Sequence, residues 1–154
     1  MPDKEIRQTE QMQNDNESML QEVVQNTEMG KNTLEELMGL THDQALKTEM
    51  LRQRNEYRRM NQQAHTALDA IGRPAKGQSA AARMSVSMGI RTRTMLDKST
   101  RNLATMLAEG SGQGVLDCKR AEKDYPAASP GAQKLCRELG DLQARAENTW
   151  REFV

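Results

Sequence analysis

The stretch AEGSGQGVLD, residues 108–117, decides how the chain folds, because three glycines fall within five positions. Such a run is either a loop that holds a phosphate or a closely packed part of a helix. A Walker loop requires GxxxxGK[S/T], and Val115 stands where the lysine would follow the last glycine. A dinucleotide-binding loop requires GxGxxG after a strand, whereas the spacing here is GxGxG after LATMLAE, which is typical of a helix. The pattern therefore argues against both phosphate-binding motifs.

Residues on either side of the glycines favour a helix that runs through them. Apolar or small side chains recur every three or four positions and stay in phase: Leu103, Leu107, Gly110, Gly114, Cys118, Ala121 and Tyr125. We predict a continuous helix in which Gly110 and Gly114 make room for bulk from a neighbouring helix, with Tyr57 or Trp150 as candidates. The alternative is a break between two shorter helices, because each glycine costs a helix interior about 1 kcal/mol.

The same periodicity predicts three more long helices, over 15–39, 42–71 and the segment after Ser129. Short connections make each sequential pair an antiparallel hairpin. In the second turn Ser129 is expected to cap the last helix, with Pro130 in its first position. We expect a disordered polar tail over 1–14 and one domain over 15–153. That domain comprises a hairpin at 15–71, a crossover at 72–97 and a second hairpin at 98–153.

The crossover segment SAAARMSVSMGIRTRTM, residues 79–95, fits two structures. Its apolar residues from Met84 to Ile90 alternate as in a strand, whereas Met84, Met88 and Met95 also share a helical face. The SAAAR start and the absence of other strand-like segments favour a helix. The predicted fold is therefore all-α, a four-helix bundle of two antiparallel hairpins joined by a long crossover with a short helix.

Composition agrees with this fold and limits the setting. Aromatic residues make up 3% of the 154 residues and charged residues 29%, and helix formers dominate. No stretch approaches the ~20 apolar residues of a membrane span, and the N-terminus lacks the apolar core of a secretory signal. Two cysteines do not make a disulfide framework. We expect a cytoplasmic protein without a membrane span.

The net charge is zero, but the charges are unevenly spread. Residues 1–71 carry 8 basic and 13 acidic side chains, a sum of −5, and residues 72–104 carry 7 basic and 1 acidic, a sum of +6. The basic residues of that middle segment are Arg73, Lys76, Arg83, Arg91, Arg93, Lys98 and Arg101. They lack interleaved aromatic residues for stacking on bases, so a nucleic-acid partner is not expected. Docking of the crossover on the acidic first hairpin, or on a protein partner, is favoured over an anionic surface.

Two parts of the chain resemble a family of small bacterial ferritin-like proteins without an assigned activity. They are TMLDKSTRNLATMLAEGSGQGVLDCKRAEKDY in the second hairpin, and TEMGKNTLEELM with LRQRNEYRRM in the first. The resemblance covers about residues 15–153. It implies a ferritin-like four-helix bundle with a crossover, in agreement with the hairpins predicted above.

Ferritin-like di-iron centres need two Glu-x-x-His motifs and two further glutamates. Neither His42 nor His65 has a glutamate three positions earlier, since Gly39 and Gln62 stand there. We therefore expect no di-iron site, no cofactor and no catalytic residues. A carboxylate-only metal site is the alternative, and its ligands would be Glu22, Glu56, Glu109 and Glu147.

The two cysteines are placed symmetrically about the last turn, nine residues on either side of position 127. In an antiparallel hairpin Cys118 and Cys136 should therefore lie at similar heights and close together. Two buried reduced thiols are expected, and a redox-linked disulfide is the alternative.

Three functions follow from these features. The first is a non-enzymatic structural or interaction module that self-associates or binds a protein partner. The second is a divergent ferritin-like metal or redox protein that uses carboxylates and the cysteine pair. The third is a binder of nucleic acid or anionic surfaces through residues 72–104.

Overall fold

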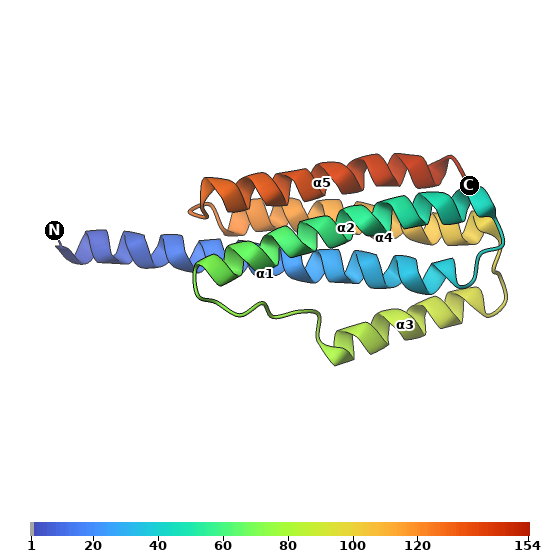
Figure 1. Ribbon diagram of the computed structural model, residues 1–154, viewed down its shortest axis with the longest axis horizontal. Coiled ribbons are helices and arrows are strands. Elements are labelled where there is room, and N and C mark those ends of the chain that lie inside the picture. Colours follow the sequence, from blue (N-terminus) through green and yellow to red (C-terminus); the bar gives the residue numbers. More distant parts are fainter. Residues whose placement is uncertain (1) are drawn as a thin grey trace.

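The computed structural model describes residues 2–154, and all of its regular structure in that range is helical (Figure 1). The helices are α1 (Pro2–Met38), α2 (Gln44–Ala70), α3 (Ala80–Thr94), α4 (Thr100–Asp124) and α5 (Pro130–Arg151). The prediction of an all-α protein is confirmed. The ambiguous segment 79–95 is helical as α3, and α4 runs without a break through all three glycines of the 108–117 stretch.

Four long helices pack side by side as two antiparallel hairpins, α1 with α2 and α4 with α5 (Figure 1). The segment between the hairpins runs along the outside of this bundle, and its short helix α3 lies against α1. Ile90 and Thr94 are the buried residues of α3. Hydrogen bonds also connect the crossover to α1. The Gln78 backbone amide donates to Glu28 at 2.6 Å, and the Ser87 hydroxyl donates to Glu36 at 2.9 Å.

Short polar side chains begin four of the helices. Each accepts a hydrogen bond from the backbone amide three residues later, which satisfies a group that the helix leaves unpaired. The caps are Asp43 at 2.9 Å, Ser79 at 3.1 Å, Ser99 at 3.2 Å and Ser129 at 3.1 Å. Pro130 follows Ser129 in the first turn of α5, as the sequence predicts.

Residues 2–14 differ from the expected disordered tail. They continue α1 as an exposed helix that projects past the rest of the bundle (Figure 1). Strong helix formers such as Glu, Gln, Lys, Arg and Met favour this state without tertiary contacts. The packed part of α1 begins at Asp15, whose carboxylate accepts a hydrogen bond from the Ala127 amide at 2.9 Å. Asn16 accepts one from the Ser129 backbone amide at 3.3 Å, so these two side chains hold the α4–α5 turn.

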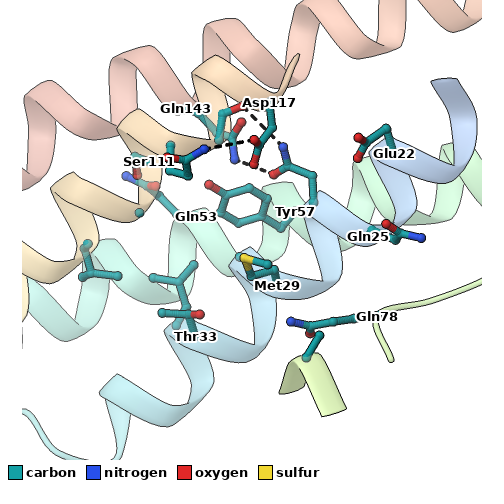
Figure 2. Close-up of a pocket in the computed structure, with 18 of the residues that line it drawn as sticks. Glu22, Gln25, Met29, Thr33, Gln53, Tyr57, Gln78, Ser111, Asp117 and Gln143 are labelled. Atoms are coloured by element: carbon teal, nitrogen blue, oxygen red, sulfur yellow. Dashed lines mark hydrogen bonds between the residues drawn. The ribbon is translucent and has the colours of Figure 1, made fainter. Parts of the chain in front are cut away.

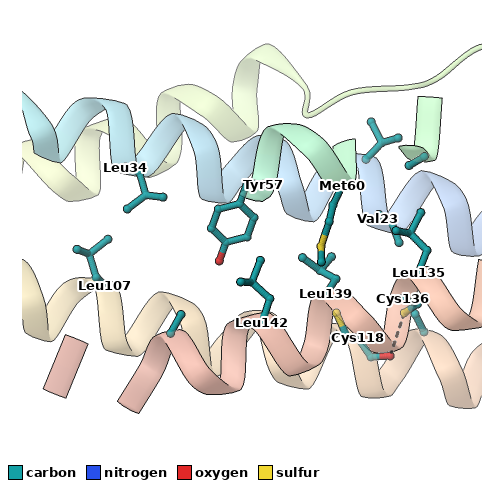
Figure 3. Close-up of a cluster of buried hydrophobic side chains, with 14 of the residues drawn as sticks. Val23, Leu34, Tyr57, Met60, Leu107, Cys118, Leu135, Cys136, Leu139 and Leu142 are labelled. Atoms are coloured by element: carbon teal, nitrogen blue, oxygen red, sulfur yellow. Dashed lines mark hydrogen bonds between the residues drawn. The ribbon is translucent and has the colours of Figure 1, made fainter. Parts of the chain in front are cut away.

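Leucine, methionine and alanine side chains from the four long helices form the core (Figure 3). Trp150, Leu34 and Met19 are among its largest fully buried side chains. Burial of each such side chain contributes about 1.5–3 kcal/mol. With only four aromatic residues in the chain, the core depends on these flexible aliphatic side chains to fill the space between the helices.

Glycines allow two large side chains to reach the middle of the bundle. A Cβ atom on Gly114 of α4 would overlap the amide of Gln143 from α5, and a Cβ atom on Gly30 of α1 would lie 2.9 Å from the Tyr57 ring. The expected partners of the α4 glycines, Tyr57 or Trp150, are therefore wrong. Gly114 accommodates Gln143, whereas Tyr57 is accommodated by α1. Gly110 is exposed, contrary to the predicted buried position, and a Cβ atom there would meet nothing within 4 Å.

Gly110 and Gly114 of α4 should respond to alanine in opposite directions. Gly110→Ala should raise the free energy of unfolding by about 1 kcal/mol, because alanine favours the helix and meets open space. Gly114→Ala should lower it by about 1–3 kcal/mol, because the new methyl group displaces the buried Gln143 amide. Urea denaturation of both variants measures the difference. A shift of equal sign and size in the two variants would contradict this packing.

Candidate functional site

A cleft of about 390 Å³ opens between α1 and α4, alongside residues 77–82 of the crossover (Figure 2). Its two long walls are α1 from Glu22 to Leu34 and α4 from Met106 to Asp117. Side chains of α2 and α5 form its floor. All five helices therefore contribute to one cavity, and it lies where the two hairpins meet.

Three glycines of α1 and α4 line this space. Gly30 lies on one wall, and Gly110 and Gly114 lie on the other. A side chain at Gly110 would project into an empty region. The 108–117 stretch is therefore part of a helix and not a loop. Its small residues form part of one wall of a cavity between helices.

Most of the cleft wall is apolar. The apolar side chains are Met29, Leu34, Met106, Leu107, Tyr57 and Trp150. Leu34 and Trp150 belong to the fully buried core, whereas Met29 is partly exposed at the outer edge. The cleft thus leads from solvent into the centre of the bundle, and its apolar surface favours a ligand with an apolar body.

A hydrogen-bonded network crosses the floor of the cleft and joins three helices. The Gln143 amide donates to Asn26 Oδ1 at 2.6 Å, and the Asn26 amide donates to the Gly114 carbonyl at 3.4 Å. The Cys118 thiol donates to Gln143 Oε1 at 3.7 Å. These contacts fix the Gln143 side chain in the space that Gly114 leaves free.

Tyr57 lies in the middle of the cleft, with Gln143 and Ser111 beside it (Figure 2). Burial raises the pKa of Tyr57 to about 12, although hydrogen bonds with Gln143 and Ser111 act in the opposite direction. The hydroxyl group is therefore neutral at physiological pH and available as a hydrogen-bond donor.

Gln53 carries a buried acceptor on the cleft wall that has no partner. Its side-chain amide donates to Glu49 Oε1 at 3.1 Å, but Gln53 Oε1 accepts no hydrogen bond. The residue is 1% exposed, and among residues 2–154 only Arg54 Nε shares this unpaired state. Burying an acceptor without a donor costs about 1–3 kcal/mol. A donor that enters the cleft would remove that cost.

Two carboxylates also line the cleft, with Glu22 at the end away from Gln53 and Asp117 closer to Tyr57 and Gln143 (Figure 2). Burial raises the pKa of Glu22, and so do the charges of Asp117 and Asp124, while Arg120 partly opposes them. Asp117 is paired with Arg120 at 3.4 Å, whereas Glu22 forms no ion pair with any of residues 2–154. No lysine, arginine or histidine in the described range lines the cleft.

The four carboxylates predicted as alternative metal ligands are not brought together. Arginines pair with three of them: Glu56 with Arg59 at 2.9 Å, Glu109 with Arg93 at 2.6 Å and Glu147 with Arg151 at 2.9 Å. Only Glu22 lies in the cleft. Within residues 2–154 no three His, Cys, Asp or Glu side chains form a group able to hold a metal ion. The carboxylate-only site is therefore wrong as predicted.

The two cysteines lie next to each other across the α4–α5 interface (Figure 3). The Cys136 sulfur is 3.6 Å from the Cys118 carbonyl oxygen, and both residues are buried as free thiols. A hydrogen bond with Cys136, together with burial, raises the pKa of the Cys118 thiol well above its usual range. Such a thiol is a poor nucleophile, because the thiolate is the reactive form.

The basic residues of the crossover divide into two groups. Arg73 pairs with Glu17 of α1 at 3.5 Å, and Arg93 pairs with Glu109 of α4 at 2.6 Å. The other five form no ion pair with residues 2–154 and are exposed: Lys76, Arg83, Arg91, Lys98 and Arg101. Docking of the crossover on the bundle thus accounts for part of the basic segment.

Gln53, Asn26 and Gln143 were not predicted as site residues from the sequence. One signal was present, since Gln53 falls on the apolar face of α2 between Met50 and Tyr57. A polar residue in that position has to find a partner or line a cavity. The spacing of residues along the sequence did not predict that α1 and α4 would lie on either side of a cleft.

None of the helices in residues 2–154 combines the length and apolar character needed to cross a bilayer. Comparisons of the chain with protein-family models, with curated proteins and with solved structures gave no match.

Glu22→Gln should stabilise the protein at neutral pH and have a smaller effect near pH 4. The raised pKa of Glu22 means that the folded state binds its proton more tightly than the unfolded state does, so the charged carboxylate lowers stability above that pKa. Urea denaturation at both pH values tests this, with Glu138→Gln on α5 as the control for lost charge. An equal gain at both pH values would contradict the burial of Glu22.

Both thiols should react slowly with Ellman's reagent in the folded protein, because both are buried and the pKa of Cys118 is raised. The hydrogen bond with Cys118 lowers the pKa of Cys136, so burial alone limits the reaction of that thiol. After denaturation without reductant, two thiols per chain should be counted. A count of zero in protein purified without reductant would instead identify a disulfide and favour the redox alternative.

Proposed function

We propose that the chain is a non-enzymatic, ferritin-like helical bundle that binds a small, largely apolar molecule in the cleft between α1 and α4. The antiparallel hairpins and the long crossover with its short helix support the ferritin-like assignment. This function specifies the interaction module expected from the sequence, with a small molecule in place of a protein as the partner.

One observation carries the proposal: the cleft combines apolar walls with a buried acceptor that no group in residues 2–154 satisfies. Its volume of about 390 Å³ falls within the range typical of small-molecule sites. A cavity of this kind lowers the stability of a bundle, because its walls lose packing contacts. Ligand binding explains why such a cavity is retained at the centre of the core.

The other two functions have less support. A metal or redox protein would need converging ligands or a reactive thiol, and three of the four proposed carboxylates are paired with arginines. A nucleic-acid binder would use the exposed cations of the crossover, which have no aromatic residues interleaved between them for base stacking.

A fluorescent apolar probe tests the proposal. N-phenyl-1-naphthylamine is uncharged at neutral pH and brightens in apolar surroundings. We expect saturable binding of one probe per chain. Gly110→Leu should weaken binding by at least about tenfold, because the new side chain projects into the cleft.

Gly89→Leu is the matched control, because Gly89 lies on α3 outside the cleft and a Cβ atom there also meets nothing within 4 Å. This variant should bind the probe as the parent protein does. Thermal denaturation of both leucine variants verifies that they are folded. Absence of saturable binding, or equal binding by the two variants, would overturn the proposal.

A further inference from the structure

We infer that the ligand is an elongated amphipathic amine, with its ammonium group between Glu22 and Asp117 and a hydrogen-bond donor at its far end near Gln53. This inference rests on the proposed function and adds the chemical class of the ligand. Three features of the cleft carry it: the sign of its charge, its apolar length and the unpaired acceptor at its inner end.

The charge of the cleft selects a cation. Glu22 and Asp117 both line it, and no basic side chain in residues 2–154 does. Arg120 already pairs with Asp117, but Glu22 has no such partner and is half-buried. An ammonium group next to Glu22 would offset the unfavourable charge of that carboxylate, since ion pairs strengthen where water is partly excluded. A carboxylate or phosphate ligand would be repelled at the same place.

A metal ion fits this site poorly. Calcium takes six to eight oxygen ligands and magnesium six, and the nearest protein donors here are two carboxylates and several amides. The described residues also hold no group of three metal-ligating side chains. Apolar walls beside the carboxylates instead favour a cation that carries its own apolar body.

The lining residues of the cleft extend along several turns of α1 and α4. Glu22 and Gly30 are eight residues apart on α1, a rise of about 12 Å. Gly30 lies under Tyr57, and Gln53 is one further turn along α2, in the direction away from Glu22 (Figure 2). Because the Glu22 and Gln53 side chains reach toward the cleft from both ends, a ligand of about 10 Å or more can contact both.

The inner end of the cleft selects a donor. Gln53 Oε1 is buried and accepts no hydrogen bond, whereas the Gln53 amide nitrogen is already used by Glu49. A hydroxyl or N–H group on the ligand would satisfy it. Met29, Met106 and Leu107 are among the apolar residues that line the cleft, and they match a chain of methylenes.

Displacement of N-phenyl-1-naphthylamine by three ten-carbon compounds tests the charge. 10-Amino-1-decanol, 1,10-decanediol and 10-hydroxydecanoate differ only at one end. We expect the amine to displace the probe at a concentration at least about tenfold lower than the diol, and the carboxylate to be weakest. Glu22→Gln should remove most of the advantage of the amine and leave the diol unchanged. Glu138→Gln, which removes a glutamate outside the cleft, should preserve the order.

The inner contact has its own matched pair. Decylamine lacks the terminal hydroxyl group of 10-amino-1-decanol, so it should displace the probe less well. Gln53→Leu removes the acceptor and should abolish this difference while it preserves the preference for an amine over an alcohol. An unchanged difference in that variant would overturn the assignment of Gln53.

The outcomes separate the inference from the function beneath it. Equal displacement by the amine and the diol, with probe binding still sensitive to Gly110→Leu, would overturn the amine and leave the ligand-binding function intact. Stronger displacement by the carboxylate would do the same. Failure of the probe to bind at all would overturn both.

Discussion

The close approach at Gly30 and Gly114 is the constraint on which the rest of the structure depends. Without side chains at these positions, Tyr57 from α2 and Gln143 from α5 reach the centre of the bundle. Two large polar side chains thereby occupy space that aliphatic residues fill elsewhere in the core. Tyr57, Gln143 and both glycines line the cleft, so the close approach of the helices determines its polar floor.

Several features of the cleft lower the stability of the fold. Gln53 keeps an acceptor unpaired in the core, and Glu22 holds its charge in a place that raises its pKa. A glycine at position 110 costs helix stability where an alanine would meet open space. Costs that lie together in one place are typical of binding sites. This clustering makes the cleft a better functional candidate than the crossover or the cysteine pair.

Local patterns predicted much of this protein. The four long helices, the continuity of α4 and the cap at Ser129 follow from periodicity and short-range hydrogen bonds. Residues 2–14 were predicted to be disordered but are helical, because their strong helix formers favour a helix without contacts to the core. The role of Asp15 was not predictable from local patterns, since its hydrogen-bond partner lies on the turn before α5, more than a hundred residues along the chain.

By itself the sequence determined the all-helical class, the order of the hairpins and the facing positions of Cys118 and Cys136, because these depend on spacing along one helix or across one turn. Only the tertiary structure decided which side chain each glycine admits, where Glu22 lies relative to Asp117 and that Gln53 lines a cavity. Those features depend on how α1 meets α4 and how α2 and α5 close the space beneath them. The periodicity within one helix does not predict which helices of different hairpins pack against each other. The candidate site could therefore be identified only in the packed bundle.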